Sequence, residues 1–545
     1  MKLRRRESIY LLLILLAALL LRVVDLGSNP PAVFRDEAEK GYTAWCLLEL
    51  GGYCDFQPDE NGSAHIVFRR WPVFVNVMGV ETSAIYQYLD IPFVAMGGLN
   101  PWTTRLPAAL AGALTVLLSF VLTRRFFDSK HALLVALLLA VSPWHIVFSR
   151  WALQGIFIPL FICWGLIWFL KGIQDERKEL FVWLSAFPFA LAFYAYSGAR
   201  PFIPLFLLVI VFVYRRPIWQ RRWHFFAGFA FFLALSLPIL FFSLSAAGGA
   251  RLERVSIFSD DLSPLQTLLT FTRNYLAHYS PNFLFIGGDS VSRHSVAGFG
   301  QLYLAEAPFL VWGLVRALRR RSAADQLLLG WFLLFPVSAA LTREGIPHAL
   351  RTIFALPMPQ ILAAIGLREA WALAKKRAVK LEPQRVVLNR GYLRAVRIFV
   401  CLVYFSFVTL FSVDLFAFYP RYSAPDWQYG VKESLELANT LRGPDAMIAV
   451  SGRITFAHYL ILYYRRIPPT ELRDRGLEAI PYALLPPLSD YGAIWSEFPK
   501  GTMLIALPDD RVPGNPIAAI PLPDERPPLP GEELAAPPAM LLYRR

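Results

Sequence analysis

The sequence has few charged residues for its length. Of its 545 residues, 17% are charged and 56% are hydrophobic, whereas soluble globular domains carry about a quarter charged residues. The hydrophobic residues lie in long blocks, and a block of about 18 or more is typical of a membrane-spanning helix. The sequence therefore predicts an α-helical polytopic membrane protein rather than a soluble one.

Cysteine is also scarce. Four cysteines are too few for a disulfide-based scaffold. Cys163 and Cys401 fall within hydrophobic blocks, where packing explains them. Cys46 and Cys54 share one predicted outer loop, and the sequence is compatible either with a disulfide between them or with two free thiols, because spacing does not reveal the geometry that a disulfide needs.

Several common catalytic motifs are missing as well. The chain has no GxxxxGK phosphate loop, no HExxH zinc motif, no GxSxG nucleophile motif and no nucleic-acid-binding motif. These absences argue against a P-loop nucleotide hydrolase, a zincin-type protease and a hydrolase of the serine-nucleophile class. Any chemistry must come from residues that are dispersed along the chain.

We predict eleven membrane spans. The first follows Lys2, Arg4, Arg5 and Arg6 and has no small-residue cleavage site after it, so we interpret it as an uncleaved helix and not as a signal peptide. The predicted spans cover residues 9–26, 104–123, 132–148, 153–170, 180–196, 200–214, 224–243, 302–318, 324–341, 350–367 and 396–418.

The positive charges predict how the chain is oriented. With a cytoplasmic N-terminus, the inner segments hold 27 of the 54 Lys and Arg residues, as the positive-inside rule requires. The net charge of +14 then reflects orientation and not nucleic-acid binding. An odd number of spans places the C-terminal region outside, so we predict an integral plasma-membrane protein. The inner segments are 1–8, 124–131, 171–180, 214–223, 316–323 and 368–397.

Two domains follow from this pattern. Residues 1–420 form a predicted transmembrane module with outer loops at 27–103 and 244–301, and residues 421–545 form a small extracytoplasmic α/β domain. In the latter, we expect a helix at 426–441 and strands at 446–450, 503–507 and 540–543.

The first outer loop is predicted to contain two helices, at about 36–50 and 86–96. In the first of these, Ala38, Tyr42, Trp45 and Leu48 share one face. A helix of this kind is expected to lie along the membrane surface, with its apolar side in lipid or against the spans.

An acidic pair, Asp36 and Glu37, follows the first predicted span at the start of a predicted helix. A carboxylate at the outer interface could accept a proton from a hydroxyl group. The alternative is that Asp36 is the N-cap of the helix, where Asp is favoured and the helix dipole stabilises its charge. The two interpretations are compatible, because a capping Asp stays ionised.

Basic residues at the outer ends of spans are candidates for binding phosphate. The positive-inside bias works against Arg150 and Arg200 at these positions, and a phosphate ligand would explain them. The alternative for any one of them is contact with lipid headgroups. The glycine-rich segment 287–301 contains Arg293 and His294 and is either a site loop or an ordinary exposed turn.

A metal site has little support in the sequence. Asp36, Glu37, His294 and His348 could be ligands if they converged, but their spacing matches no known ligand pattern. We therefore predict no metal ligands, although a divalent metal is compatible with this chemistry.

Taken together, these features resemble the GT-C membrane glycosyltransferases. The similarity is to the branch that holds the protein O-mannosyltransferases, the lipid A aminoarabinose transferase and many bacterial relatives, and it covers about residues 1–420. The segments that carry it are Asp36-Glu37, Asn100–Ala109, Ser142-Pro143 with Arg150, Arg293–Gln301 and His348–Pro357.

The resemblance implies an inverting transfer of a hexose or pentose from a polyprenyl-phosphate-linked donor to a lipid, glycan or protein acceptor on the outer face of the membrane. It assigns Asp36 as the base, with Glu37 in support, and makes no cofactor certain beyond the polyprenyl-phosphate-linked sugar donor. The predicted residues for holding the donor and its phosphate are Lys40, Arg150, Arg200, Arg293, His294, His348 and Arg351.

Two departures from the family pattern limit what it implies. At the outer end of the third and fourth spans, where some relatives have a second catalytic Asp, this chain has Gln154. The C-terminal region does not resemble the β-trefoil domain of the eukaryotic O-mannosyltransferases, which puts a protein acceptor in doubt.

Two other functions fit a chain of this kind. A lipid or sugar transporter typically has charged residues near the bilayer midplane, whereas these spans are nearly free of charge in their middles. A polysaccharide polymerase or ligase also uses outer-face arginines on a lipid-phosphate donor, but the acidic pair after the first span favours the transferase.

Overall fold

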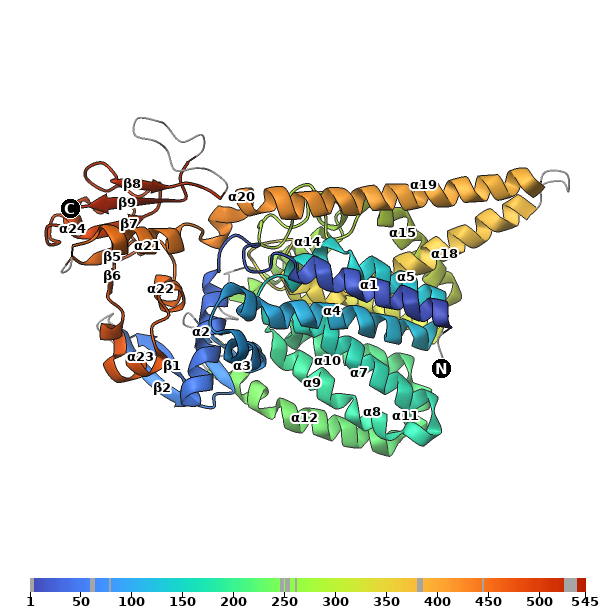
Figure 1. The fold of residues 1–545 in the computed structure, drawn as a ribbon. Helices are drawn as coiled ribbons and strands as arrows, with labels where there is room; N and C mark the ends of the chain where they lie inside the picture. The colour runs from blue at the N-terminus through green and yellow to red at the C-terminus, as the bar shows by residue number, and fades with distance from the viewer. Residues whose placement is uncertain are drawn as a thin grey trace. The chain divides into compact units, whose positions relative to one another are not determined.

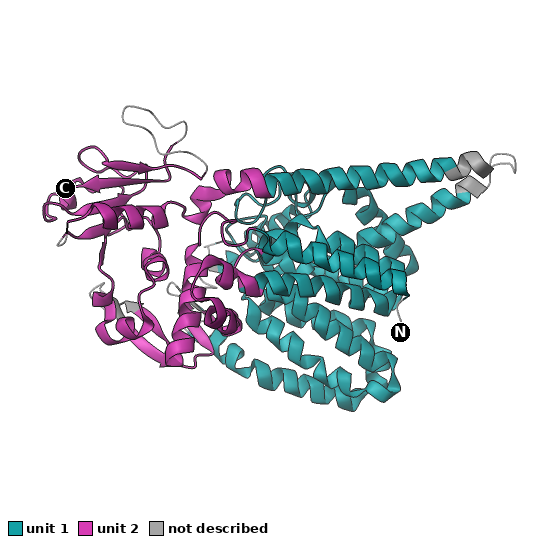
Figure 2. Ribbon diagram, in the orientation of Figure 1, with its two compact units in different colours: residues 1–24, 108–149, 154–415 teal, residues 25–107, 150–153, 416–545 magenta. Residues whose placement is uncertain are grey.

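The computed structural model describes residues 4–58, 64–77, 80–245, 249, 255–259, 262–379, 386–443, 446–523 and 537–545 (Figure 1). The chain divides into two compact units, each made of segments that are distant in sequence (Figure 2). Unit 1 comprises residues 1–24, 108–149 and 154–415, and unit 2 comprises residues 25–107, 150–153 and 416–545.

Unit 1 is built of helices that pack side by side. The neighbouring pairs include α7 with α9, α9 with α12, α10 with α16, and α15 with α18. The helices of this unit are α1 (Arg5–Val23), α5 (Ser129–Ala140), α6 (Pro143–Ser149), α7 (Phe157–Gln174), α8 (Leu180–Leu184), α9 (Ala186–Ala195), α10 (Ala199–Val213), α11 (Arg215–Gln220), α12 (Arg222–Leu244), α14 (Pro264–Ala277), α15 (Ala307–Arg320), α16 (Ala323–Leu334), α17 (Val337–Ala340), α18 (Met358–Val379) and α19 (Val386–Val413), together with most of α4 (Pro101–Phe126).

Five helical stretches in the described part of the chain are long and apolar enough to cross a membrane. They are Pro101–Phe126, Gln154–Gln174, Arg222–Leu244, Ala323–Ala340 and Gly391–Trp427. Helices α5 and α6 are bent by 57° at their junction, and if the two form one broken span, the number of candidate spans in the described part of the chain rises to six. All eleven predicted spans coincide with helical segments, but several of these are shorter, so the count of eleven stays a prediction.

Unit 2 combines the first predicted outer loop with the C-terminal region (Figure 2). The predicted boundary at residue 420 lies close to the 415/416 division, whereas residues 25–107 group with the C-terminal region and not with the helices of unit 1. The helices of unit 2 are α2 (Arg35–Leu50), α3 (Ile85–Gly97), α20 (Tyr419–Ser423), α21 (Val431–Leu441), α22 (Ala457–Arg465), α23 (Pro469–Arg475) and α24 (Gly492–Trp495).

The strands of unit 2 form two hairpins and one larger sheet. The antiparallel hairpins are β1 (Gly52–Pro58) with β2 (Ala64–Arg70), and β3 (Phe74–Val77) with β4 (Val80–Ser83). The larger sheet has the order β6-β5-β7-β9-β8, in which β5 pairs in parallel with β6 and β7 and the other pairs are antiparallel. Its strands are β5 (Ile448–Val450), β6 (Tyr482–Leu484), β7 (Met503–Ala506), β8 (Ala518–Ile520) and β9 (Met540–Arg544).

Helix α2 is the centre of unit 2. It packs against α3 on one side and α22 on another, so most of its residues from Glu37 to Leu47 are buried. The predicted single apolar face is wrong, because the C-terminal region also covers α2, while the predicted position along the membrane surface stays a prediction. At Gly41, α2 lies close to α22, since a Cβ atom there would lie 2.8 Å from the ring of Tyr463.

Candidate functional site

Asp36 lies in the first turn of α2. The helix begins at Arg35, and Phe34 is its extended N-cap residue. Asp36 is therefore the second helical residue, and the interpretation of Asp36 as the N-cap is wrong. Its side chain is half-buried, and its carboxylate has no hydrogen-bond or ion-pair partner among the residues that the structure describes.

Both carboxylate oxygens of Glu37 accept hydrogen bonds. It is fully buried, and Arg105 donates from Nε to Oε1 and from Nη2 to Oε2, both at 2.9 Å. The backbone N–H groups of Phe34 and Ala152 also donate to it, at 3.1 Å and 2.9 Å. With four donors on two oxygens, Glu37 fixes the start of α2 and has no oxygen free to act as a base.

Arg105 connects Glu37 to the segment that follows α1. Its Nη1 donates to the carbonyl oxygens of Leu26 at 3.0 Å and Pro30 at 2.9 Å, and its Nη2 donates to that of Ala32 at 2.5 Å. The sequence prediction did not assign Arg105 a role. The available signal was its position within Asn100–Ala109, an arginine at the entry of a long apolar helix.

Lys40 and Arg150 are buried and already have protein partners. The Nζ of Lys40 donates to the backbone carbonyl of Asp36 at 3.1 Å and lies 3.7 Å from a carboxylate oxygen of Glu39. Arg150, 1% exposed, donates to the carbonyl of Asn29 at 2.7 Å. Binding of donor phosphate by either residue stays a prediction, and both stabilise the surroundings of α2.

The segment after strand β5 lies at the start of α2. The guanidinium of Arg35 donates to the hydroxyl of Thr455 and lies 5.5 Å from the ring centre of Phe456. Gln428 accepts from the backbone N–H of Arg35 at 3.2 Å and donates to the carbonyl of Thr455 at 3.0 Å. The C-terminal region therefore contributes directly to the surroundings of Asp36.

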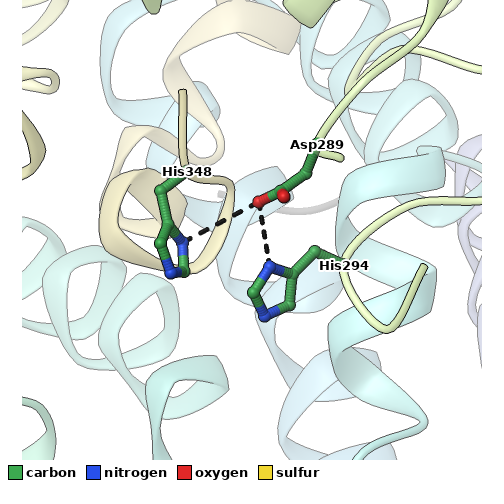
Figure 3. A group of neighbouring side chains, drawn as sticks. All are labelled: Asp289, His294 and His348. Carbon is green, nitrogen blue, oxygen red and sulfur yellow. Dashed lines mark hydrogen bonds and ion pairs between the residues drawn. The ribbon is translucent and has the colours of Figure 1, made fainter. Parts of the chain in front are cut away.

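A second cluster lies in unit 1, where Asp289, His294 and His348 face one another (Figure 3). The Nδ1 of His294 is 2.9 Å from Oδ2 of Asp289, and the Nδ1 of His348 is 3.8 Å from the same oxygen. One ligand atom from each residue lies within 4.8 Å of the other two. The sequence prediction included both histidines but not Asp289, although Asp289 stands in the same glycine-rich segment.

The charges in this cluster are set by burial and by the neighbours. Burial raises the pKa of the Asp289 carboxyl, but hydrogen bonding and attraction from His294 outweigh it, and the net pKa is below its ordinary value. Burial lowers the pKa of His348 well below its ordinary value. The cluster thus combines an ionised carboxylate with a neutral imidazole.

The remaining predicted cations also lie in unit 1. Arg351 donates from Nη1 to the hydroxyl of Thr342 at 2.6 Å and to the carbonyl of Glu344 at 2.8 Å, and it lies three residues after His348. Arg200, in the first turn of α10, has its guanidinium 5.6 Å from the ring centre of Phe242. Arg293 is half-buried beside His294 in the chain.

The predicted site residues are thus distributed over both units. Asp36, Glu37, Lys40 and Arg150 belong to unit 2, and Arg200, Arg293, His294, His348 and Arg351 belong to unit 1. The structure brings together residues within each set, while the convergence of the two sets on one donor molecule stays a prediction.

Comparison with known proteins relates this architecture to a family. Residues 85–242 match the family model described as dolichyl-phosphate-mannose-protein mannosyltransferase. The structure is similar to that of ArnT from Cupriavidus metallidurans in the apo state, with 16% identity, a TM-score of 0.54, and coverage of 92% of this chain and 93% of that one. The protein has the GT-C glycosyltransferase fold.

Two further structures share the GT-C fold. ArnT bound to undecaprenyl phosphate is 15% identical, with a TM-score of 0.54 and coverage of 92% and 94% of the two chains. The oligosaccharyltransferase AglB from Archaeoglobus fulgidus, in complex with an inhibitory peptide and a dolichol-phosphate, is 15% identical with a TM-score of 0.50. The alignment covers 84% of this chain and spans 63% of the length of AglB. No curated protein matches the sequence.

Proposed function

We propose that this GT-C protein is an inverting glycosyltransferase that moves a hexose or pentose from a polyprenyl-phosphate-linked donor to a lipid, glycan or protein acceptor. Structures that share its fold were solved with undecaprenyl phosphate and with a dolichol-phosphate. The observation that carries the proposal is the Asp36 carboxylate, which is half-buried and unpartnered within the described structure, next to a fully engaged Glu37.

The proposed reaction is a single displacement. Asp36 accepts the proton of the acceptor hydroxyl while that oxygen attacks the anomeric carbon of the donor sugar. A new C–O bond forms, the bond between the sugar and the phosphate oxygen breaks, and the polyprenyl phosphate leaves with the bonding electrons. Attack from the face opposite the leaving group inverts the anomeric configuration.

Two kinds of basic residue would assist this reaction. Arg200, Arg293, His294, His348 and Arg351 are the proposed contacts for the donor, because cationic or hydrogen-bonding groups stabilise the charge that develops on the leaving phosphate. Lys40 and Arg150, which have protein partners, would instead keep the segments around Asp36 in position.

The same proposal includes the membrane arrangement. Eleven spans, a cytoplasmic N-terminus and an extracytoplasmic C-terminal region would place α2 and the segment after β5 on the outer face. The uneven distribution of Lys and Arg supports this orientation. Asp36 would then lie on the side of the membrane where lipid-linked sugars are delivered to acceptors.

The test is the variant Asp36→Asn, which keeps the side-chain shape and removes the proton acceptor. Glycolipids, glycans and glycoproteins are compared by mass spectrometry in cells that lack the gene and in cells that carry the wild type, D36N or the control E436Q. Glu436 is an exposed acid of the same unit. We expect the product to fall about 100-fold or more in D36N and to stay at the wild-type level in E436Q.

Protein level and unfolding temperature are measured for each variant in parallel. An unchanged product in D36N, at normal protein level, would show that Asp36 is not the base. A gene-dependent product that is a relocated lipid-linked sugar, with no new glycosidic bond, would favour the transporter instead.

A further inference from the structure

We propose that unit 1 binds an anionic phospholipid, with one acyl chain in a cavity between helices and the phosphate at the arginines of residues 214–222, which we call the basic connection. The cavity has a volume of about 530 Å³ and lies among α7, α8, α9, α10 and α12. Volumes of about 300–1,000 Å³ are typical of sites that bind small molecules. This binding site is separate from the proposed transferase chemistry.

The lining of the cavity suits a hydrocarbon chain. Phenylalanine is its commonest residue, and among the described lining residues none carries a charge and only Ser185 and Ser236 carry a hydroxyl group. The hydroxyl of Ser185 already donates to the carbonyl oxygen of Val182 at 2.7 Å. A ligand in this cavity is therefore held by apolar contact along its length.

The cavity opens between α10 and α12. Helix α9 packs against both of them, whereas α10 and α12 do not pack closely against each other within the described part of the chain. Leu208 of α10 and Phe226 and Phe229 of α12 line the cavity and are also exposed. Both helices fall in predicted membrane spans, so an opening between them would face the lipid chains.

The length of the cavity indicates an extended ligand. Its lining residues on α12 reach from Phe225 to Leu240. At about 1.5 Å per residue, this stretch is roughly 22 Å long. The hydrocarbon core of a bilayer is about 30 Å thick, so the cavity is longer than one leaflet is deep and suits a chain that enters from one side of the membrane.

Arginines lie at one end of this cavity. Phe225 and Phe226, which line it, are three and four residues after Arg222, the first residue of α12. Residues at this spacing share one face of a helix, so Arg222 continues the face that lines the cavity. Arg215 lies two residues beyond the end of α10, which lines the cavity from the other side. Guanidinium groups bind phosphate oxygens through paired N–H donors.

The charges of these two arginines are not neutralised by acids. Arg215 and Arg222 are exposed and have no ion-pair partner among the residues that the structure describes. Glu179 instead has its carboxylate oxygens 3.3 Å from Nε of Arg221 and 3.6 Å from Nδ1 of His224. Positive charge beside an apolar cavity is complementary to an anionic phospholipid, because basic pockets between spans bind such headgroups.

Two tryptophans indicate that the basic connection lies at the level of the headgroups. Trp219 and Trp223 are exposed, and the guanidinium of Arg222 lies 5.9 Å and 5.7 Å from their ring centres. Tryptophan is enriched at the interface between membrane and water. The proposed orientation of the chain would place this interface on the cytoplasmic side, where anionic lipids attract basic segments.

The experiment uses the purified full-length chain, freed of lipid in a neutral detergent and titrated with palmitoyl-oleoyl phosphatidylglycerol. Bound lipid is counted by native mass spectrometry. We expect saturation at about one phosphatidylglycerol per wild-type chain. Phosphatidylcholine with the same chains should bind the wild type about fivefold more weakly or less, and phosphatidylglycerol should bind R215Q/R222Q more weakly by a similar factor, because charge-assisted hydrogen bonds are lost.

The matched control is R319Q/R320Q. Arg319 and Arg320 are exposed residues in the last turn of α15 and lie in another predicted inner segment, where the positive-inside bias alone explains them. R319Q/R320Q removes the same charge as R215Q/R222Q and should bind phosphatidylglycerol as the wild type does.

A second variant tests the chain site without changing any charge. Ala186→Phe fills the cavity from α9 and leaves the basic connection intact. Phosphatidylglycerol should raise the unfolding temperature of the wild type, because a ligand that binds only the folded state stabilises it, and should leave that of A186F unchanged. The unfolding temperature without lipid checks that A186F is folded.

Three results would overturn the proposal. Equal binding of phosphatidylglycerol by R215Q/R222Q and R319Q/R320Q would reject the phosphate contact, and wild-type binding by folded A186F would reject the chain site. Undecaprenyl phosphate that displaces phosphatidylglycerol at equal concentration would assign the cavity to the chain of a sugar donor instead. Specific phosphatidylglycerol binding by a protein that transfers no sugar would reject the transferase and support the lipid site.

Discussion

At the scale of single residues, the adjacent acids Asp36 and Glu37 have different environments. Glu37 accepts from four donors, two of which are the Nε and Nη2 of Arg105, while Asp36 accepts from none in the described structure. In the sequence the two carboxylates are equivalent. Only their hydrogen-bond partners distinguish Glu37, which holds the start of α2, from Asp36, the candidate base. Three of the four donors come from 68 and 115 residues away, beyond what local pattern can predict.

This difference predicts that Glu37→Gln and Asp36→Asn behave differently. E37Q leaves the Arg105 guanidinium buried without its counter-charge, which typically costs about 3–5 kcal/mol. We expect a clear fall in unfolding temperature for E37Q and little change for D36N, measured by thermal unfolding of the purified protein. Equal unfolding temperatures for both would argue against Glu37 as the anchor of α2.

Asp90, on helix α3, provides a prediction about pH. It is fully buried, and neither carboxylate oxygen has a hydrogen-bond partner among the described residues. Burial therefore raises its pKa well above the ordinary value. A carboxyl whose pKa is raised in the folded protein ionises at lower pH in the unfolded chain, where its pKa is near 4. The free energy of unfolding therefore falls as the pH rises above about 4. We expect D90N to match the wild type below about pH 4 and to become more stable than it as pH increases.

Unfolding temperatures measured from pH 4 to pH 8 check this expectation. The matched control is E436Q, whose exposed acid should leave the slope with pH unchanged. A D90N curve parallel to the wild type over the whole range would show that Asp90 is ionised without cost in the folded protein.

At the scale of elements, the bend between α5 and α6 lies where Pro143, which has no backbone N–H, begins α6, and a buried arginine binds the end of α5. Helix α5 ends at Ala140, and Arg22 of α1, fully buried, donates to the carbonyl oxygens of Ala18 and Ala140 at 2.8 Å and 2.9 Å and contacts Nδ1 of His145 at 2.7 Å. A buried helix end needs donors of this kind. The apolar pattern predicted one continuous span at 132–148 and gave no sign of the arginine that ends α5.

We therefore expect Arg22→Met to destabilise unit 1. The substitution leaves the carbonyl of Ala140 and the ring of His145 without a donor, at a cost of roughly 1–3 kcal/mol for each unsatisfied group. The control R6M changes an exposed arginine of the same helix and should have no effect. A similar unfolding temperature for both variants would mean that water or another group satisfies the helix end.

The local elements were more predictable than their surroundings. Helices predicted at 36–50 and 86–96 lie at 35–50 and 85–97, and strands β5, β7 and β9 fall where short apolar runs predicted them. Hairpins β1–β2 and β3–β4 were missed, because their residues do not alternate clearly. The burial of both sides of α2 was also missed, since the covering helix α22 begins more than 400 residues later.

At the scale of the whole molecule, long apolar blocks predicted a helical membrane protein, and the resemblance of short motifs such as Asn100–Ala109 predicted the GT-C fold. The site was predictable only as a set of residue types. His294 and His348 meet Asp289 within unit 1, but sequence spacing gave no reason to connect them.

Unit 2 depends on contact between the first loop and the C-terminal region, and Gly41 provides a test. In Gly41→Ala, the added Cβ would lie 2.6 Å from Oγ1 of Thr104 and 2.8 Å from the ring of Tyr463, and overpacking of this kind costs about 1–3 kcal/mol. We expect G41A to lower the unfolding temperature and to increase protease cleavage within residues 25–107.

Gly391→Ala is the matched control, because, among the described residues, no heavy atom beyond its own helix backbone lies within 4 Å of the added Cβ and alanine is the better helix former. G391A should be as stable as the wild type or slightly more so. Resistance of G41A to protease would show that the neighbours of Gly41 accommodate the added methyl group and that the contact between α2 and α22 is kept.

The composition of unit 2 from three distant segments has a consequence for biosynthesis. Residues 25–107 leave the ribosome long before residues 416–545, the partners that bury α2. At about 5–20 residues per second, the interval is on the order of half a minute. During that time the acidic first turn and the apolar side of the same helix lack their covering partners, so the folding of α2 waits for the synthesis of residues 416–545.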